Sequence, residues 1–140
     1  MGIIRTNIEL FNAADLDLFR RKKMSAKDVK KISVMALVDT GAYMLAINEN
    51  IRRQLDLSVT DHQFAEIATG EVIELEVVGP IEIRFENRRT VTEAVVLPGN
   101  DTEVLLGAIP MEAMDVVIDM KLQELKVNPL HPTRPQLSLK

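Results

Sequence analysis

The sequence lacks several residue types on which common kinds of protein depend. Its 140 residues include no cysteine and no tryptophan, and the aromatic residues are one tyrosine and four phenylalanines. Without cysteine there is no disulfide scaffold, thiolate zinc site, iron–sulfur cluster or cysteine nucleophile. The two histidines, His62 and His131, lie far apart in the sequence, so we expect no metal site and no cofactor. The shortage of aromatic residues also argues against a surface on which nucleic-acid bases stack.

Strong positive charge and long hydrophobic runs are missing as well. Seventeen basic and twenty-one acidic residues give a net charge of −4, whereas a protein that binds a nucleic-acid backbone is usually basic, so we expect no nucleic-acid partner. Apolar runs such as residues 34–38 are far shorter than the about 20 residues that span a membrane. The N-terminus lacks the basic-then-apolar order of a secretory signal. We therefore expect a cytoplasmic protein without membrane contact.

The composition and patterning that are present predict a single β-rich domain. Apolar residues make up 46% and charged residues 27% of the chain, which is typical of a globular domain with its own core. Short alternating segments separated by turn signals about every 8–12 residues predict an all-β fold, a closed antiparallel barrel-like lobe with one or two short helices. We expect this domain at residues 1–127. Prolines recur in residues 128–140, so we expect an extended C-terminal tail there.

The pattern also predicts individual elements. The predicted strands are residues 3–11, 15–19, 32–38, 64–67, 72–78, 81–85, 90–97, 104–106, 116–120 and 122–127. Residues 12–17 read as a turn, and Gly79-Pro80 is expected to break the chain between two strands. Helices are predicted at 48–57, with Asn48 as the N-cap, and at 110–114, with Pro110 near the first position. The basic segment 20–31 reads as a solvated connection.

One local sequence contains candidate functional residues. Asp39 directly follows the apolar strand 32–38, and an ionised carboxylate is costly to bury alone. Asp39 is therefore hydrogen-bonded, paired or functional. Gly41 allows a sharp turn in which backbone N–H groups point at the carboxylate, and Thr40 offers a hydroxyl. Taken alone, the tripeptide is more typical of an Asx turn that ends a strand.

Three elements in order give the sequence a family resemblance. Ala36-Leu-Val-Asp-Thr-Gly-Ala42 resembles the active-site loop of retroviral-type (retropepsin-like) aspartic proteases. A hairpin with the tip Ile67-Ala-Thr-Gly-Glu71 stands in the place of the family's flap, and Leu105-Leu-Gly107 precedes a short helix. Residues 3–127 can be laid on one retropepsin-like lobe. The run 105–119 looks like small bacterial single-lobe members of the family.

The resemblance implies an aspartic endopeptidase that acts on polypeptides. A single Asp-Thr-Gly in the chain implies a homodimer, in which Asp39 of each copy contributes one carboxylate of a dyad that activates a water molecule. Thr40 would hydrogen-bond across the dimer, and Gly41 would offer its backbone to the substrate. The residues implied for the flap and the walls of the substrate site are Ala42, Ala68, Thr69, Gly70, Leu106 and Gly107.

Departures from the retroviral pattern leave a second interpretation open. Tyr43 and Ala108 occupy the positions where retroviral members have an acidic residue and an arginine that pair. The flap tip carries Thr69-Gly70 in place of a glycine-rich sequence, and the C-terminal hairpin and tail do not supply interleaved terminal strands. The alternative is a non-catalytic module that keeps the lobe and binds or assembles peptides or proteins, because a fold does not determine function.

Other acidic residues have structural interpretations. Asp119 also follows a buried strand, but Met120 stands where the first loop has Thr-Gly, so a turn or capping role is expected. Asp61 and His62 are adjacent without a serine or cysteine nucleophile, and we expect a surface turn there.

Overall fold

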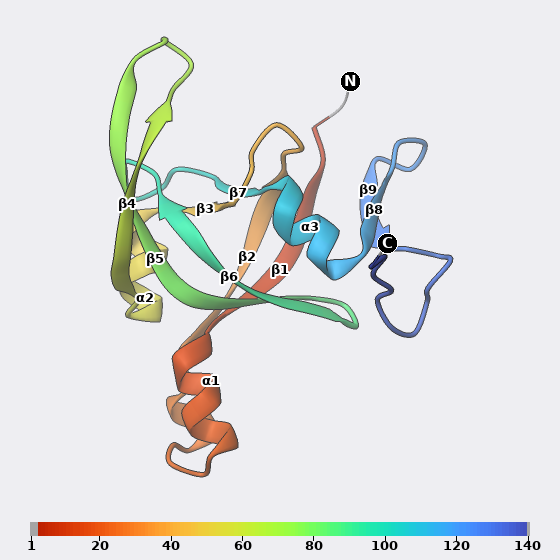
Figure 1. Cartoon of the computed structure of the whole chain (residues 1–140), viewed down its shortest axis with the longest axis horizontal. Helices are drawn as coiled ribbons and strands as arrows, with labels where there is room; N and C mark the ends of the chain where they lie inside the picture. The colour runs from red at the N-terminus through yellow and green to blue at the C-terminus, as the bar shows by residue number, and fades with distance from the viewer. Residues whose placement is uncertain (1–2, 140) are drawn as a thin grey trace.

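The computed structural model describes residues 3–139, and this part of the chain forms nine strands and three short α-helices (Figure 1). The strands are β1 (Arg5–Asn12), β2 (Lys31–Val38), β3 (Leu45–Ile47), β4 (Ser58–Glu66), β5 (Val72–Phe85), β6 (Arg88–Val96), β7 (Val104–Leu106), β8 (Val116–Asp119) and β9 (Glu124–Val127). The helices are α1 (Ala13–Arg20), α2 (Glu49–Leu55) and α3 (Ala108–Met114), with a 3₁₀ turn at Ala26–Asp28.

Six of the strands close into a barrel. Their order is β1-β2-β7-β3-β6-β5, and β5 returns to pair with β1, while β4 extends the sheet beyond β5. This confirms the predicted all-β, barrel-like lobe. The β2–β7 and β3–β6 pairs are parallel, whereas only antiparallel pairs were expected. The reason is that β3 and β7 are three-residue strands reached by crossovers, and hairpin patterns in the sequence do not reveal such pairs.

The barrel interior is the hydrophobic core. Fully buried side chains come from β1, β3, β5 and β7, among them Leu10, Leu45, Ile47, Ile83 and Leu106. Each alternates along its strand with residues on the outer face, as the two-residue period of a strand requires. Burying one such side chain contributes about 1.5–3 kcal/mol, so the core holds the barrel together.

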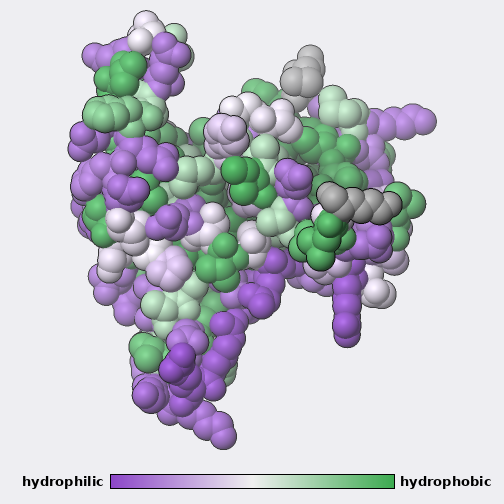
Figure 2. Space-filling view, in the orientation of Figure 1, coloured by the Kyte–Doolittle hydropathy of each residue, from purple (hydrophilic) through white to green (hydrophobic). Residues whose placement is uncertain are grey.

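A third helix replaces the turn and strand predicted for residues 12–19. Asn12 accepts a hydrogen bond from the backbone N–H of Asp15 at 3.1 Å and thereby caps α1. Leu16 is buried beside Phe11, so the Asp-Leu alternation that reads as a strand is a helix with one inward face. The basic segment after α1 forms a hydrophilic surface at one end of the molecule (Figure 2).

The chain does not break at Gly79-Pro80 as the sequence predicts. β5 runs through these residues, and its pairing with β6 is irregular between Val78 and Ile81. Before this irregularity β5 pairs with β4, and after it with β1. The exposed Pro80 thus marks the corner where one long strand passes from the outer hairpin into the barrel.

Two hairpins and one loop extend from the same side of the barrel (Figure 1). They are the β4–β5 hairpin, the β2–β3 loop and the separate two-stranded β8–β9 sheet. Asp61 and His62 are exposed within β4, so the surface turn expected there is wrong. Among residues 3–139, no helix is both long and apolar enough to span a membrane.

Candidate active site

The loop after β2 holds Asp39 through backbone hydrogen bonds. The N–H of Asp39 donates to the carbonyl of Leu106 at 3.0 Å, which joins the loop to the end of β7. The N–H of Gly41 donates to Oδ1 of Asp39 at 2.9 Å. Within the described residues no donor bonds the second carboxylate oxygen, Oδ2, of this half-buried side chain. One carboxylate oxygen is thus held by the loop backbone, and the other has no hydrogen-bond donor among the described residues.

Gly107 allows the start of α3 to press against the same loop. A Cβ atom at this position would lie 2.3 Å from the carbonyl oxygen of Met44 and 2.8 Å from that of Ala42, which is closer than atoms can approach. The first two N–H groups of the helix donate to the loop: Ala108 to the carbonyl of Ala42 at 2.8 Å, and Ile109 to that of Tyr43 at 3.1 Å. These donors would otherwise lack partners inside the helix.

The same backbone contacts lie at the positions where retroviral members have an ion pair and this chain has Tyr43 and Ala108. Tyr43 and Ala108 cannot form an ion pair, and the Tyr43 side chain is 77% exposed. The backbone of the 42–43 segment is nevertheless bonded to the backbone of residues 108–109. Main-chain hydrogen bonds therefore join the two segments that a side-chain pair would join in the retroviral pattern.

An apolar groove of about 390 Å³ runs between this loop and the β4–β5 hairpin. Its floor includes Ala46, Val95 and Leu105, which face one another across β3, β6 and β7 because they are paired in register. One wall is residues 41–44, and the other includes Gln63, Ala65, Glu66 and Ile67. The groove has the apolar lining and the open edge that an extended peptide needs.

A second groove, of about 320 Å³, is lined by the two loop residues that precede the 41–44 segment. Asp39 and Thr40 line it together with apolar residues, which are Ile3, Ile4, Leu37, Val38, Ile118 and Met120. Asp39 thus lies where the loop passes from one groove to the other. Hydrophobic side chains are also visible on the surface over β8 and β9 (Figure 2).

The structure brings some of the sequence-predicted site residues together and separates others. Asp39, Thr40, Gly41 and Ala42 are consecutive in the loop, and Gly107 packs against it. Leu106 is fully buried in the core and meets the loop through its carbonyl group. Ala68, Thr69 and Gly70 form the exposed tip of the β4–β5 hairpin, beyond the residues that line the groove.

Several groove residues were missed in the sequence. They are Met44, Ala46, Gln63, Ala65, Leu75, Val95, Leu97 and Leu105. The alternation of Gln63 and Ala65 places them on one face of β4, with Ile67 just beyond the end of the strand, and this pattern was a usable signal. The floor had no such signal, because it depends on parallel and crossover pairings between distant short strands.

Asp119, the second aspartate that follows an apolar strand, has a structural role. Asp119 accepts hydrogen bonds from the N–H groups of Lys121 and Leu122, both at 3.0 Å, and pairs with Lys126 at 2.9 Å. The bond from Leu122 and the contact with Lys126 hold the pKa of the Asp119 carboxyl below its ordinary value. This confirms the expected turn role. No three His, Asp or Glu side chains between residues 3 and 139 gather as a metal site requires.

Comparison with known families agrees with this geometry. A family model described as "gag-polyprotein putative aspartyl protease" matches residues 27–111, which is more than half of the chain and includes both the Asp39 loop and the start of α3. No curated protein sequence matches the chain.

Proposed function

Because the chain belongs to the gag-polyprotein aspartyl protease family, we propose that it is an aspartic endopeptidase that cleaves polypeptides as a homodimer. The observation that carries this proposal is the setting of Asp39. Its carboxylate is half-buried at the end of a core strand, and one oxygen is held by the N–H of Gly41. Asp39 lines one apolar groove, and a second apolar groove begins two residues further along the loop, at Gly41. We place the protease domain at residues 1–127, followed by the segment 128–140.

The proposed chemistry requires two carboxylates. Asp39 of one copy faces Asp39 of the other across a two-fold axis, and the two share one proton because both cannot comfortably be ionised side by side. The ionised carboxylate takes a proton from water, which attacks the scissile carbonyl carbon. The protonated carboxyl gives its proton to the carbonyl oxygen. The carboxyl that took the proton from water then gives it to the leaving nitrogen as the C–N bond breaks, and the other carboxylate takes a proton from a hydroxyl of the intermediate, which restores the dyad. Thr40 stiffens the loop across the dimer, and the Gly41 backbone contacts the substrate.

The groove that Asp39 and Thr40 line supports the placement of the dimer interface on this face of the lobe. Around it, Ile3, Met120 and Leu122 are large apolar side chains with more than half of their surface exposed. A second copy placed over this face would cover them and bring in the second Asp39. The symmetry is self-consistent, because in a two-fold dimer each copy presents the same patch to the other.

The apolar groove between the 41–44 segment and the β4–β5 hairpin supports a polypeptide substrate. β4 pairs with β5 along one edge, and its exposed side chains flank the groove floor. A peptide in extended conformation would lie between this strand and the 41–44 segment, and its backbone would bond to theirs as an added strand. The hairpin tip, with Ala68, Thr69 and Gly70, would close over the peptide, while Ala42 and Gly107 form the wall beside the reacting bond and Leu106 supports it from below.

The direct test is cleavage of a proteome-derived peptide library followed by mass spectrometry. Wild type is compared with Asp39→Asn between about pH 4 and pH 7 at several protein concentrations. Asn keeps an oxygen that accepts from the N–H of Gly41, so the variant should fold. Glu49→Gln is the matched control, because it removes a half-buried carboxylate that pairs with Arg52 on α2 and lines neither groove.

We expect wild type and Glu49→Gln to cut at the same sites and Asp39→Asn to cut none. The rate per chain should rise with concentration as dimers form. If folded wild type cuts nothing under any condition, the protease proposal is wrong. The lobe would then be a peptide-binding or assembly module, the interpretation that the sequence leaves open.

A further inference from the structure

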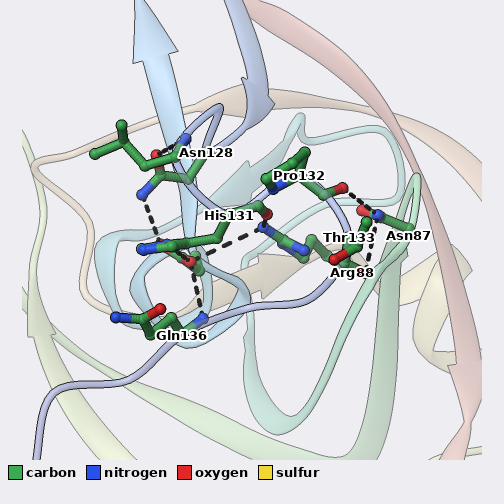
Figure 3. A network of polar contacts seen from close by, with 9 residues as sticks. Asn87, Arg88, Asn128, His131, Pro132, Thr133 and Gln136 are labelled. Carbon is green, nitrogen blue, oxygen red and sulfur yellow. Dashed lines mark hydrogen bonds and ion pairs between the residues drawn. The ribbon is translucent and has the colours of Figure 1, made fainter.

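A network of polar contacts gathers around Asn128, His131 and Gln136 (Figure 3). Its shared partner is Asp115, which follows the C-terminal end of α3, the end away from the Asp39 loop. Asp115 follows the helix in a left-handed conformation, with φ 55°. Its Oδ1 accepts from Nδ2 of Asn128 at 3.0 Å, and its Oδ2 accepts from the backbone N–H of Gln136 at 3.0 Å. Nδ1 of His131 lies 2.6 Å from Oδ2. One half-buried carboxylate therefore binds three positions of the C-terminal segment.

These contacts close residues 128–136 into a loop, which we call the C-terminal clasp. Its first and last residues both bond to Asp115, and the N–H of Asn128 also donates to the carbonyl of Asp115 at 3.2 Å. The middle of the clasp is held from the other side, where Nδ2 of Asn87 donates to the carbonyl of Pro132 at 2.8 Å. The clasp is thus fixed to α3 on one side and to the start of β6 on the other.

Because of Arg88, the attachment of the clasp depends on the negative charge of Asp115. Its side chain is fully buried, its Nη2 donates to the carbonyl of His131, and its ion-pair partner is Asp115 at 3.9 Å. Two further nitrogens, Nε and Nη1, have no hydrogen-bond partner among the described residues. A buried guanidinium with so few partners is costly, so the charge of Asp115 is needed to keep it in place.

The helix α3 connects the C-terminal clasp, at its C-terminal end, to the Asp39 loop, at its N-terminal end. The helix is seven residues long, or about 10 Å. Its first N–H groups, from Ala108 and Ile109, bond to the carbonyls of Ala42 and Tyr43, and Gly107 leaves no free space at that contact. A short rigid helix that is fixed at Asp115 cannot tilt without moving the 42–43 segment, which follows Asp39 by three and four residues.

We propose that the C-terminal clasp positions the Asp39 loop through α3, with Asp115 as the positioning residue. The clasp does not touch the substrate groove, so its effect is on the geometry of the carboxylate rather than on peptide binding. This inference rests on the proposed protease function for its kinetic consequence, but its structural consequence can be measured in a protein that cleaves nothing.

The experiment measures amide hydrogen exchange in the full chain for wild type, Asp115→Asn and Asp119→Asn. The two variants make the same substitution in half-buried carboxylates that each bond to several partners, but only Asp115 binds the clasp and α3. In Asp115→Asn we expect the amides of Ala108, Ile109 and Gly41 to exchange about tenfold faster, while amides in β1 and β5 keep the wild-type rates. Asp119→Asn should leave the loop amides unchanged.

A milder variant keeps the test decisive if Asp115→Asn does not fold. The double substitution Asn128→Ala with His131→Ala removes two side-chain contacts from the clasp and leaves Arg88 its counter-ion. The proposal is overturned if the clasp amides exchange faster in either variant and those of Ala108, Ile109 and Gly41 do not. With a cleavable peptide, Asp115→Asn should lower kcat and leave KM unchanged. Absence of cleavage by wild type would count against the protease proposal alone.

Discussion

The carbonyl oxygen of Met44 lies where a side chain at Gly107 would begin, 2.3 Å from the position of a Cβ atom there. This contact joins the loop that carries Asp39 to the helix that supports it. Residue 107 must therefore be glycine for reasons of space, since its φ of −86° is open to any residue.

Gly107→Ala should displace the loop from α3. We expect the free energy of unfolding to fall by about 1–3 kcal/mol, the usual cost of an overpacked site, and cleavage to fall further than stability because the Asp39 carboxylate moves. Urea unfolding and the library assay measure the two effects. Gly70→Ala is the control for the urea measurement alone, because the hairpin tip belongs to the proposed substrate site. Its Cβ meets no atom within 4 Å, and its positive φ of 87° costs about 1 kcal/mol. Equal stability and activity in Gly107→Ala and wild type would contradict the assigned contact.

Ala65→Phe should fill the groove between β4 and the 41–44 segment. The larger side chain would take part of the about 390 Å³ that a peptide would occupy, so we expect cleavage to fall at least about tenfold with little change in melting temperature. The neighbouring Phe64 points away from the groove and is 76% exposed, so Phe64→Ala should cleave as wild type does. The groove is not the substrate site if the two variants behave alike.

Acid should release the C-terminal clasp. Hydrogen bonds from Asn128 and from the backbone of Gln136, with a further contact from His131, lower the pKa of Asp115 from 3.8 to about 2. A carboxyl whose pKa is lower in the folded state stabilises the fold above the unfolded-state pKa, and this contribution is lost as the pH falls from about 4 to about 2. Urea midpoints of wild type should therefore fall more steeply over this range than those of Asp115→Asn. Parallel curves for the two proteins would contradict the assignment.

Glu82→Gln should loosen α1 from the barrel. Glu82 is fully buried, and burial raises its pKa, but hydrogen bonds from Arg84 at 2.7 Å and Arg20 at 3.2 Å outweigh this and hold the pKa below its ordinary value. Loss of the charge weakens both bonds, so the free energy of unfolding should fall by about 1–3 kcal/mol in urea titrations. Glu74→Gln, at an exposed position of β5, should change it by less than about 0.5 kcal/mol. Equal losses in both variants would mean that the Glu82 cluster is not structural.

The parts of the fold that depend on local sequence could be predicted. Asn48 was expected to cap a helix, and its Oδ1 accepts from the N–H of Ile51 at 3.0 Å. The Asp39 turn was expected to point an N–H at the carboxylate, and the N–H of Gly41 does so. Both features are complete within three residues of chain, so the sequence alone contains their physical cause.

The parts that depend on distant pairing could not be predicted in the same way. The groove floor exists because Ala46 pairs with Leu105 on one side and Val95 on the other, across strands too short to show a period. Pro80 reads as a break, yet β5 exchanges one partner strand for another there and continues. The clasp joins Asp115 to Gln136 through a backbone N–H, which leaves no trace in residue type.

The most direct test of the central claim, that two Asp39 carboxylates act together, is a mixing titration. Wild type and Asp39→Asn are combined at constant total concentration, allowed to exchange subunits, and assayed on a peptide that wild type cleaves. If both carboxylates are required, an equal mixture contains about one quarter of the active dimers and should cleave at about one quarter of the wild-type rate. A rate of about one half, proportional to the wild-type chain present, would contradict the account, because it would mean that each chain works without a second Asp39.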